Sequence, residues 1–415
     1  MNFFRNLEPA TQRNLRVLFT AGLLFWSSLA ALLPTLSLYI QHVGGTNQQV
    51  GIVIGAFAIG MLLFRPWMGH LADQQGRKIV LLIGLFAVAV APLGYLYTQS
   101  ISLLIAIRAF HGLSIAAFTT AYTALVVDIS PIQSRGEVIG YMSLVNPVGM
   151  AIGPALGSFF QEWAGYTPLF LLSAGAGFIG LICAFQVVAP PLPLTPSISK
   201  QTTNQLFWQL LGSSRLRVPT VVMLLIGLAF GALATFLPLL IQSTQVNFNA
   251  GLFFAAGAGS SFGARLLTGR ASDRYGRGRF ITLSLGLYAA AMLLIWSAQH
   301  PVSFLLAGVL EGAGAGILIP MMLALIADRS QPNERGRVFG LCWIGFDLGI
   351  AIAGPILGHF ADAIGYRELF RLASGLALLA LIIFITQCSK DLPHSIKFAL
   401  GRGKDLYALP CNPQR

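Results

Sequence analysis

The sequence contains twelve runs of about 20 mostly apolar residues, separated for the most part by short polar loops. An α-helix rises 1.5 Å per residue, so each run is long enough to cross the hydrocarbon core of a membrane. A membrane β-barrel would show strands of about ten alternating residues instead, and the chain lacks that pattern. We therefore predict an all-α integral membrane protein with twelve transmembrane helices. The runs lie near residues 17–40, 50–68, 79–98, 102–127, 137–160, 167–189, 218–242, 250–268, 280–298, 302–327, 337–361 and 368–389.

The composition excludes the main soluble classes. Only 10% of the 415 residues are charged and 55% are hydrophobic, whereas soluble domains carry roughly 25% charged residues. A soluble enzyme, a secreted disulfide scaffold and a disordered protein are excluded on that ground. The four cysteines have no paired spacing, so we expect no disulfide framework and no metal site. No nucleotide-binding loop or nucleophile and base arrangement is visible, so we expect no cofactor and no enzyme activity.

The net charge of +12 is explained by topology. In a soluble protein it would suggest a nucleic-acid partner, but here the cations gather in alternate loops, as they do on the cytoplasmic side of membranes. We therefore expect a protein of the cell (inner) membrane with both termini in the cytoplasm, where its cations contact anionic lipid. We expect no nucleic-acid partner. We also expect the protein to be a monomer. Only Arg367 and Arg371 break the pattern. The loops without Lys or Arg are 41–49, 99–101, 161–166, 243–249 and 299–301.

The two halves of the chain repeat each other at an offset of about 200 residues. Gly165-Tyr166 recurs as Gly365-Tyr366, and many charged and glycine positions recur in the same way. Because each half has six spans, both halves have the same inside-outside sense, which predicts a parallel repeat. We predict an N-terminal half over 1–189, a cytoplasmic linker over 190–217, a C-terminal half over 218–389 and a cytoplasmic tail over 390–415.

Three motifs resemble the major facilitator superfamily. The segment GHLADQQGRK at 69–78 resembles the family's loop between spans two and three, and GRASDRYGRG at 269–278 resembles its degenerate copy. Arg108 and Gly112 resemble the span-four motif of the family. A span-five pattern is typical of the 12-span drug/proton antiporter branch, and it consists of Gly140, Gly149, Gly153, Pro154 and Gly157.

The resemblance assigns a gating role to the charges around the two loops. In the family, the loop carboxylate locks the halves together on the cytoplasmic side in the outward-open state, and an arginine with a span-four acid completes the network. The residues alone suggest that Gly69 permits a close helix approach and that Gly76 permits a positive φ. The alternative is a set of solvated loop charges. The implied gate residues are Gly69, Asp73, Gly76, Arg77, Asp128 and Arg135, with the copies Gly269, Asp273, Gly276, Arg277, Asp328 and Arg335.

The span-five glycines give a helix face on which another helix can lie close, and Pro154 permits a bend. In the resembled branch this motif is linked to export and to preventing leak. A pure packing role is the alternative.

Glu311 and Asp347 are the acids that fall near the middle of predicted spans. A charge at the bilayer centre costs at least about 3 kcal/mol, so such residues usually line a water-filled path. Arg108 and His111 lie one turn apart on span four, and His111 corresponds to Glu311 in the repeat. The fold implied by the resemblance has Arg108, His111 and Glu311 facing one another across a central cavity. Either an Arg–Glu pair neutralises buried charge, or Glu311 or Asp347 carries a coupled proton.

Aromatic residues are the candidate substrate contacts. A lining of this kind suits amphiphilic or aromatic small molecules. We therefore expect a secondary transporter that exports small organic molecules against protons by alternating access. An uptake symporter of a metabolite and a non-transporting receptor or assembly factor on the same fold are the alternatives. The candidate lining residues are Trp26, Tyr122, Phe230, Phe254, Trp343 and Phe346.

Overall fold

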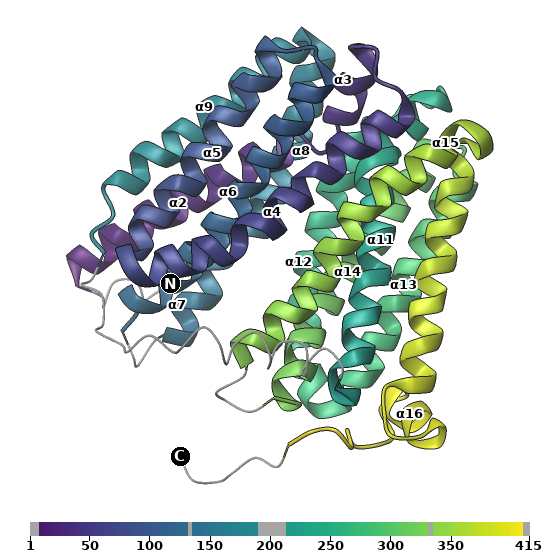
Figure 1. The fold of residues 1–415 in the computed structure, drawn as a ribbon. Coiled ribbons are helices and arrows are strands. Elements are labelled where there is room, and N and C mark those ends of the chain that lie inside the picture. Colours follow the sequence, from purple (N-terminus) through teal and green to yellow (C-terminus); the bar gives the residue numbers. More distant parts are fainter. Residues whose placement is uncertain (1–7, 132–134, 190–212, 331–334, 410–415) are drawn as a thin grey trace.

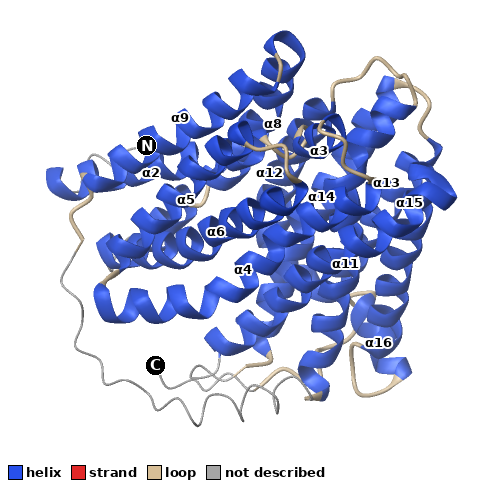
Figure 2. Ribbon diagram, turned by 45° about the horizontal axis from the view of Figure 1, so that its top comes forward, coloured by secondary structure: helices blue, strands red, loops and turns tan. Residues whose placement is uncertain are grey.

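A computed structural model describes residues 8–131, 135–189, 213–330 and 335–409. Within α-helices the side chains of residues 269, 270, 273, 335–337, 339 and 341 are not described. The described residues form helices and connecting loops without a strand (Figure 2).

The described part of the first half contains eight helices that make six spans. The first span bends at residues 32–35, which divides it into α2 and α3, and a similar break separates α7 from α8. Each remaining helix forms one span. In chain order they are α2 (Pro9–Ala31), α3 (Leu36–His42), α4 (Asn47–Gln75), α5 (Arg77–Tyr97), α6 (Ile101–Ile129), α7 (Arg135–Met142), α8 (Val145–Ala164) and α9 (Tyr166–Phe185).

The second half repeats this arrangement with fewer breaks. Its helix α15 contains a kink at Gly365, so it consists of two spans. Helix α12 is rich in Gly, Ser and Arg, and it is not among the ten described helices that are apolar enough to be recognised as spans. With α12 and the second part of α15, the predicted twelve spans are confirmed. The helices are α11 (Ser214–Ser243), α12 (Ala250–Tyr275), α13 (Arg277–Ser297), α14 (Pro301–Asp328), α15 (Arg335–Gln387) and α16 (Leu392–Ala399).

Glycines at matching positions of the repeat make the tight turns between spans. Gly76 has a φ of 104° and joins α4 to α5, and Gly276 has a φ of 84° and joins α12 to α13. A side chain at such a φ is strained, so glycine is the favoured residue. The positive φ predicted for Gly76 is confirmed.

The two halves converge at one end of the bundle and diverge toward the other (Figure 1). At the converging end, Gln41 of the first half donates a hydrogen bond of 2.6 Å to Tyr366 of the second, and Asn47 bonds to Asp362. Glycines allow the contact: a Cβ at Gly51 would overlap the backbone of α15. We call the diverging end, which carries the turns at Gly76 and Gly276 and helix α16, the basic end.

The glycine face of α8 packs against α2 within the first half. A Cβ at Gly149 would lie 2.5 Å from the Cβ of Trp26, and one at Gly153 would lie 2.5 Å from the carbonyl oxygen of Ser27. Gly157 is packed against Ala31 in the same way, whereas Gly140 has open space around it and does not belong to this contact. The backbone oxygen of Pro154 instead faces Gly251 of α12, so this part of α8 contacts the other half.

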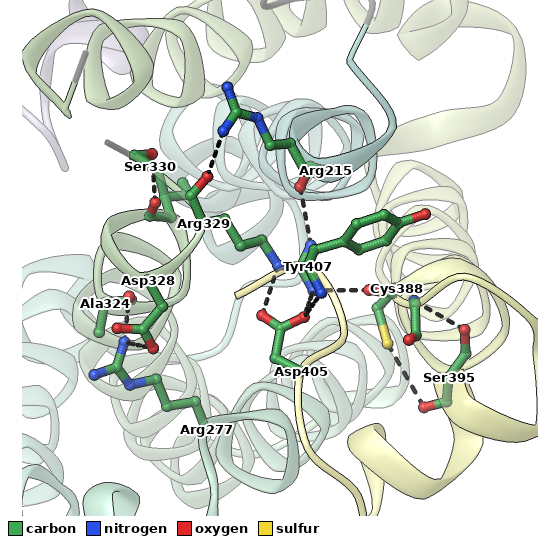
Figure 3. A network of polar contacts seen from close by, with 12 residues as sticks. Arg215, Arg277, Ala324, Asp328, Arg329, Ser330, Cys388, Ser395, Asp405 and Tyr407 are labelled. Atoms are coloured by element: carbon green, nitrogen blue, oxygen red, sulfur yellow. Dashed lines mark hydrogen bonds and ion pairs between the residues drawn. The ribbon is translucent and has the colours of Figure 1, made fainter. Parts of the chain in front are cut away.

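The segment after α15 is folded onto the basic end of the second half (Figure 3). Asp391 caps α16 by accepting a hydrogen bond of 2.9 Å from the backbone N–H of His394, which lowers the pKa of that carboxyl. Further along, Asp405 forms a 2.7 Å ion pair with Arg329, whose side chain is 0% exposed. Arg329 also donates to the carbonyl oxygens of Arg215 at 2.9 Å and Cys388 at 2.7 Å. One guanidinium therefore joins α11, the end of α14, the end of α15 and the C-terminal segment.

We expect Arg329→Gln to destabilise the protein by about 3 kcal/mol, because it leaves Asp405 buried without its cation and removes several hydrogen bonds. The measurements are thermal unfolding in detergent and limited proteolysis of the segment after α16. Arg402→Gln, at an exposed position of the same segment, is the control and should leave both unchanged. Equal melting temperatures for the two variants would contradict the prediction.

Candidate transport site

A cavity of about 1000 Å³ lies between the two halves. Its wall extends from Leu32 on the first span to Arg77 and Asp128 near the basic end. Because the halves are in contact at the opposite end, the cavity opens toward the basic end. Most of the wall is apolar, with a few charged side chains, as expected for a site that takes organic molecules.

The aromatic residues chosen from the sequence lie on this wall, with one exception. Trp26, Phe230, Phe254, Trp343 and Phe346 all line the cavity. Tyr122 does not: it is buried against Phe118, and its hydroxyl donates a hydrogen bond of 3.0 Å to the carbonyl oxygen of Met142. The interpretation of Tyr122 as a lining residue is therefore wrong, because packing turns its side chain toward α7.

Arg108 lies on the wall and is only 6% exposed. Its guanidinium carbon is 4.3 Å from the ring centre of Phe57, a cation–π contact. The neighbouring Gly112 makes this possible, since a Cβ there would overlap the backbone of Phe57 and keep α6 away from α4.

His111 lies behind Arg108 and does not line the cavity. Its Nδ1 is 3.4 Å from Arg108 Nη1 and 3.0 Å from the hydroxyl of Tyr95. The predicted cluster of Arg108, His111 and Glu311 is therefore formed only in part. The structure brings Arg108 and His111 together, and Glu311 takes a different neighbour.

Glu311 lies on the opposite wall, 8% exposed. Among the described residues it forms no ion pair, and its polar neighbour is the hydroxyl of Tyr288 on α13. Close packing of α14 on α12 positions it, because a Cβ at Gly312 would overlap the backbone of Gly257. This carboxyl faces the cavity without a cation.

Asp347 is paired across the two halves. Its carboxylate lies 2.9 Å from Arg65 of α4, and both residues line the cavity. The contact lies beyond the glycine contacts of α4 with α15, on the side facing the basic end. This ion pair is not predicted from the sequence, where Arg65 served only as a marker of the repeat.

The gate loops contain two equivalent ion pairs. Arg77 pairs with Asp128 and donates a hydrogen bond of 3.1 Å to the carbonyl oxygen of Ala124. Arg277 pairs with Asp328 and bonds to the carbonyl oxygen of Ala324 in the same way. In each half the pair joins the start of the third span to the end of the fourth span.

The other gate residues have different surroundings. Asp73 is exposed, with no hydrogen bond or ion pair to the described residues, and Gly69 has open space where a close helix was expected. Arg135 is half-buried at the start of α7, and its Nε has no hydrogen-bond partner among the described residues. The surroundings of Gly269 and the side chains of Asp273 and Arg335 lie outside what the structure describes.

Arg265 is a further wall residue that was not among the candidate site residues. The repeat contains the signal that could have found it, because Arg65 and Arg265 are equivalent and both lie inside apolar spans. No comparable signal exists for Tyr288.

Comparison with known proteins agrees with this architecture. The profile of the Major Facilitator Superfamily matches residues 18–271 and 260–405. The chain belongs to the major facilitator superfamily.

Several members are similar over nearly the whole length of this chain. The multi-drug resistance efflux pump PmrA of Streptococcus pneumoniae is 26% identical, covering 86% of this chain and 91% of PmrA. The quinolone resistance protein NorA of Staphylococcus aureus is 24% identical, covering 89% and 95%. A crystal structure of a mutant nucleoside transporter NupG has the same fold, with a TM-score of 0.78, 13% identity and coverage of 89% and 98%. This major facilitator protein is thus a secondary transporter integral to a membrane, and it is not an enzyme.

Proposed function

We propose that this major facilitator protein is a proton-coupled exporter of small amphiphilic organic molecules, working as a monomer. The observation that carries the proposal is the cavity between the halves, with aromatic side chains on both walls and a cation-free carboxyl at Glu311. The drug-export relatives support the direction of transport.

The orientation follows from the distribution of charge. The turns at the basic end carry Arg77 and Lys78 after α4 and Arg277 and Arg279 after α12, whereas short loops at the other end have almost no cations. Under the positive-inside rule, the basic end and both termini face the cytoplasm, and anionic lipid contacts these cations. The structure then corresponds to an inward-open state of a protein in the cell membrane.

Glu311 is the better candidate for the proton carrier. Asp347 is paired with Arg65, so protonating it would break an inter-half ion pair. Glu311 has no cationic partner, and it can bind and release a proton without that cost. Alternating exposure of this carboxyl to the two sides would couple proton entry to substrate exit.

The experiment uses inside-out vesicles with an imposed pH gradient and a panel of amphiphilic anions, cations and neutral molecules. We expect at least one probe to accumulate only when the vesicle interior is acidic, and collapse of the gradient with a protonophore should abolish accumulation. Empty vesicles are the control. Accumulation that requires the opposite gradient would favour the uptake symporter, and gradient-independent binding would contradict transport.

A further inference from the structure

Arg265 differs from the other described arginines of the cavity wall. Its Nε is buried without a hydrogen-bond partner among the described residues, which is also true of Arg108. Unlike the other wall arginines, however, Arg265 has neither an acid nor an aromatic ring as partner among the described residues. Arg65 has Asp347, Arg77 has Asp128, and Arg108 lies on Phe57. A guanidinium that is partly removed from water needs a compensating group, and none of the described residues provides one here.

The internal repeat shows which group is missing. Arg65 and Arg265 are equivalent, and the contact of α4 with α15 corresponds to the contact of α12 with α8. In this part of the repeat the offset is 200 or 201 residues, so the position of Asp347 corresponds to Pro147 or Asn146. Asn146 lines the cavity but carries no charge. The interface of α4 with α15 therefore contains a carboxylate, that of Asp347, whereas the interface of α12 with α8 contains the neutral amide of Asn146.

The remaining wall charges do not neutralise Arg265. The described wall contains four arginines and three acids, and two ion pairs leave Arg108 and Arg265 with only Glu311. Glu311 contacts α12 at Gly257, eight residues before Arg265, which is about 12 Å along a helix. The cavity is net positive even with Glu311 ionised, and Arg265 is separate from the carboxyl proposed to carry the proton.

We propose that Arg265 binds the acidic group of an amphiphilic organic anion, which takes the place of the carboxylate that Asp347 provides in the other interface. A guanidinium accepts a carboxylate in a two-bond geometry, and the aromatic wall accommodates the apolar body of the molecule. This inference rests on the proposed transport function and names the substrate class of that cavity. Molecules with the same apolar body and a cationic group are disfavoured there.

The test uses three probes that share a phenyl ring and chain length: 4-phenylbutyrate, 4-phenylbutanamide and 4-phenylbutylamine. Binding to the purified full-length protein is followed by the change in tryptophan fluorescence, since Trp26 and Trp343 lie on the wall. We expect the butyrate to bind at least about tenfold more tightly than the amine, a difference of about 1.4 kcal/mol. Arg265→Gln should abolish this preference, and Arg265→Lys should retain part of it.

Asn146→Asp is the sharper variant, because it adds a carboxylate where the repeat has one and leaves Arg265 in place. It should abolish the preference for the butyrate, whereas the matched control Asn146→Gln should keep it. Size-exclusion profiles and melting temperatures identify a variant that fails to fold, and Arg265→Gln provides the second, independent test. Tighter binding of the amine, no saturable binding of the butyrate, or an unchanged preference in both Arg265→Gln and Asn146→Asp would overturn the proposal.

The binding measurements, combined with transport in the inside-out vesicles, distinguish this inference from the proposed function. If amphiphilic cations are exported against protons and the butyrate does not bind, the proposed anion site at Arg265 is contradicted and the proposed exporter function is supported. If the butyrate binds through Arg265 but transport of no probe responds to a pH gradient, the proposed anion site is supported and the proposed proton coupling is contradicted.

Discussion

Glu311→Gln is expected to reduce transport driven by a pH gradient by at least about tenfold, because glutamine occupies the same space as the protonated carboxyl but cannot release a proton. Substrate exchange at equal pH on both sides should persist, because exchange needs no net proton movement. The measurement is substrate-evoked pH change in proteoliposomes, alongside exchange of labelled substrate. Glu311→Asp retains a carboxyl and should retain part of the coupling.

Asp347→Asn is the matched control for this prediction. It removes the other buried acid of the wall and leaves Arg65 without its ion pair, so we expect slower transport that still depends on the pH gradient. If Glu311→Gln keeps full coupling and Asp347→Asn loses it, the carrier is Asp347. If both keep it, the proton is carried elsewhere.

Asp73→Asn is expected to reduce transport at least about tenfold without reducing the amount of protein in the membrane. In the present state Asp73 is exposed and forms no hydrogen bond or ion pair with the described residues, so the substitution removes nothing that stabilises this state. Its proposed role is to hold the halves together when the basic end closes. The variant should therefore remain trapped with the cavity open toward the basic end.

The measurements are transport rate, melting temperature and reaction of a cysteine introduced into the cavity wall with a thiol reagent added from the basic side. The reaction should be as fast as in the parent protein, or faster. Glu137→Gln, at another exposed acid near the basic end, is the control and should transport normally. Full activity in Asp73→Asn would show that Asp73 is only a solvated loop charge.

The ion pairs beside the turns at Gly76 and Gly276 illustrate what the family resemblance predicts from motifs in the sequence. Arg77 and Asp128 belong to a motif that recurs as Arg277 and Asp328, and the structure pairs the residues in both halves. Spacing within a motif and repetition at a fixed offset are visible without a structure. The positive φ of Gly76 is predictable for the same reason, because a tight turn between two helices imposes it.

The buried charges show which features could not be predicted from the sequence. Their depth in the membrane follows from counting residues along a span at 1.5 Å each, but their direction depends on how neighbouring helices pack. Close contact of glycine faces turns Glu311 toward Tyr288 and places Asp347 beside Arg65. Depth and helix position also place His111 and the aromatic Tyr122 in the cavity, yet packing turns both side chains away from it.

The sequence alone determined the number of spans, the repeat and the two mid-membrane acids of this protein, because apolar length and periodicity are properties of consecutive residues. Which charges are paired and which face the cavity depends on how the helices pack. The physical reason is that an ion pair between halves joins residues almost 300 positions apart, from Arg65 to Asp347, and no pattern of neighbours along the chain encodes that contact. The same holds for Arg265, whose lack of a partner among the described residues depends on how α12 packs and not on its neighbours in the sequence.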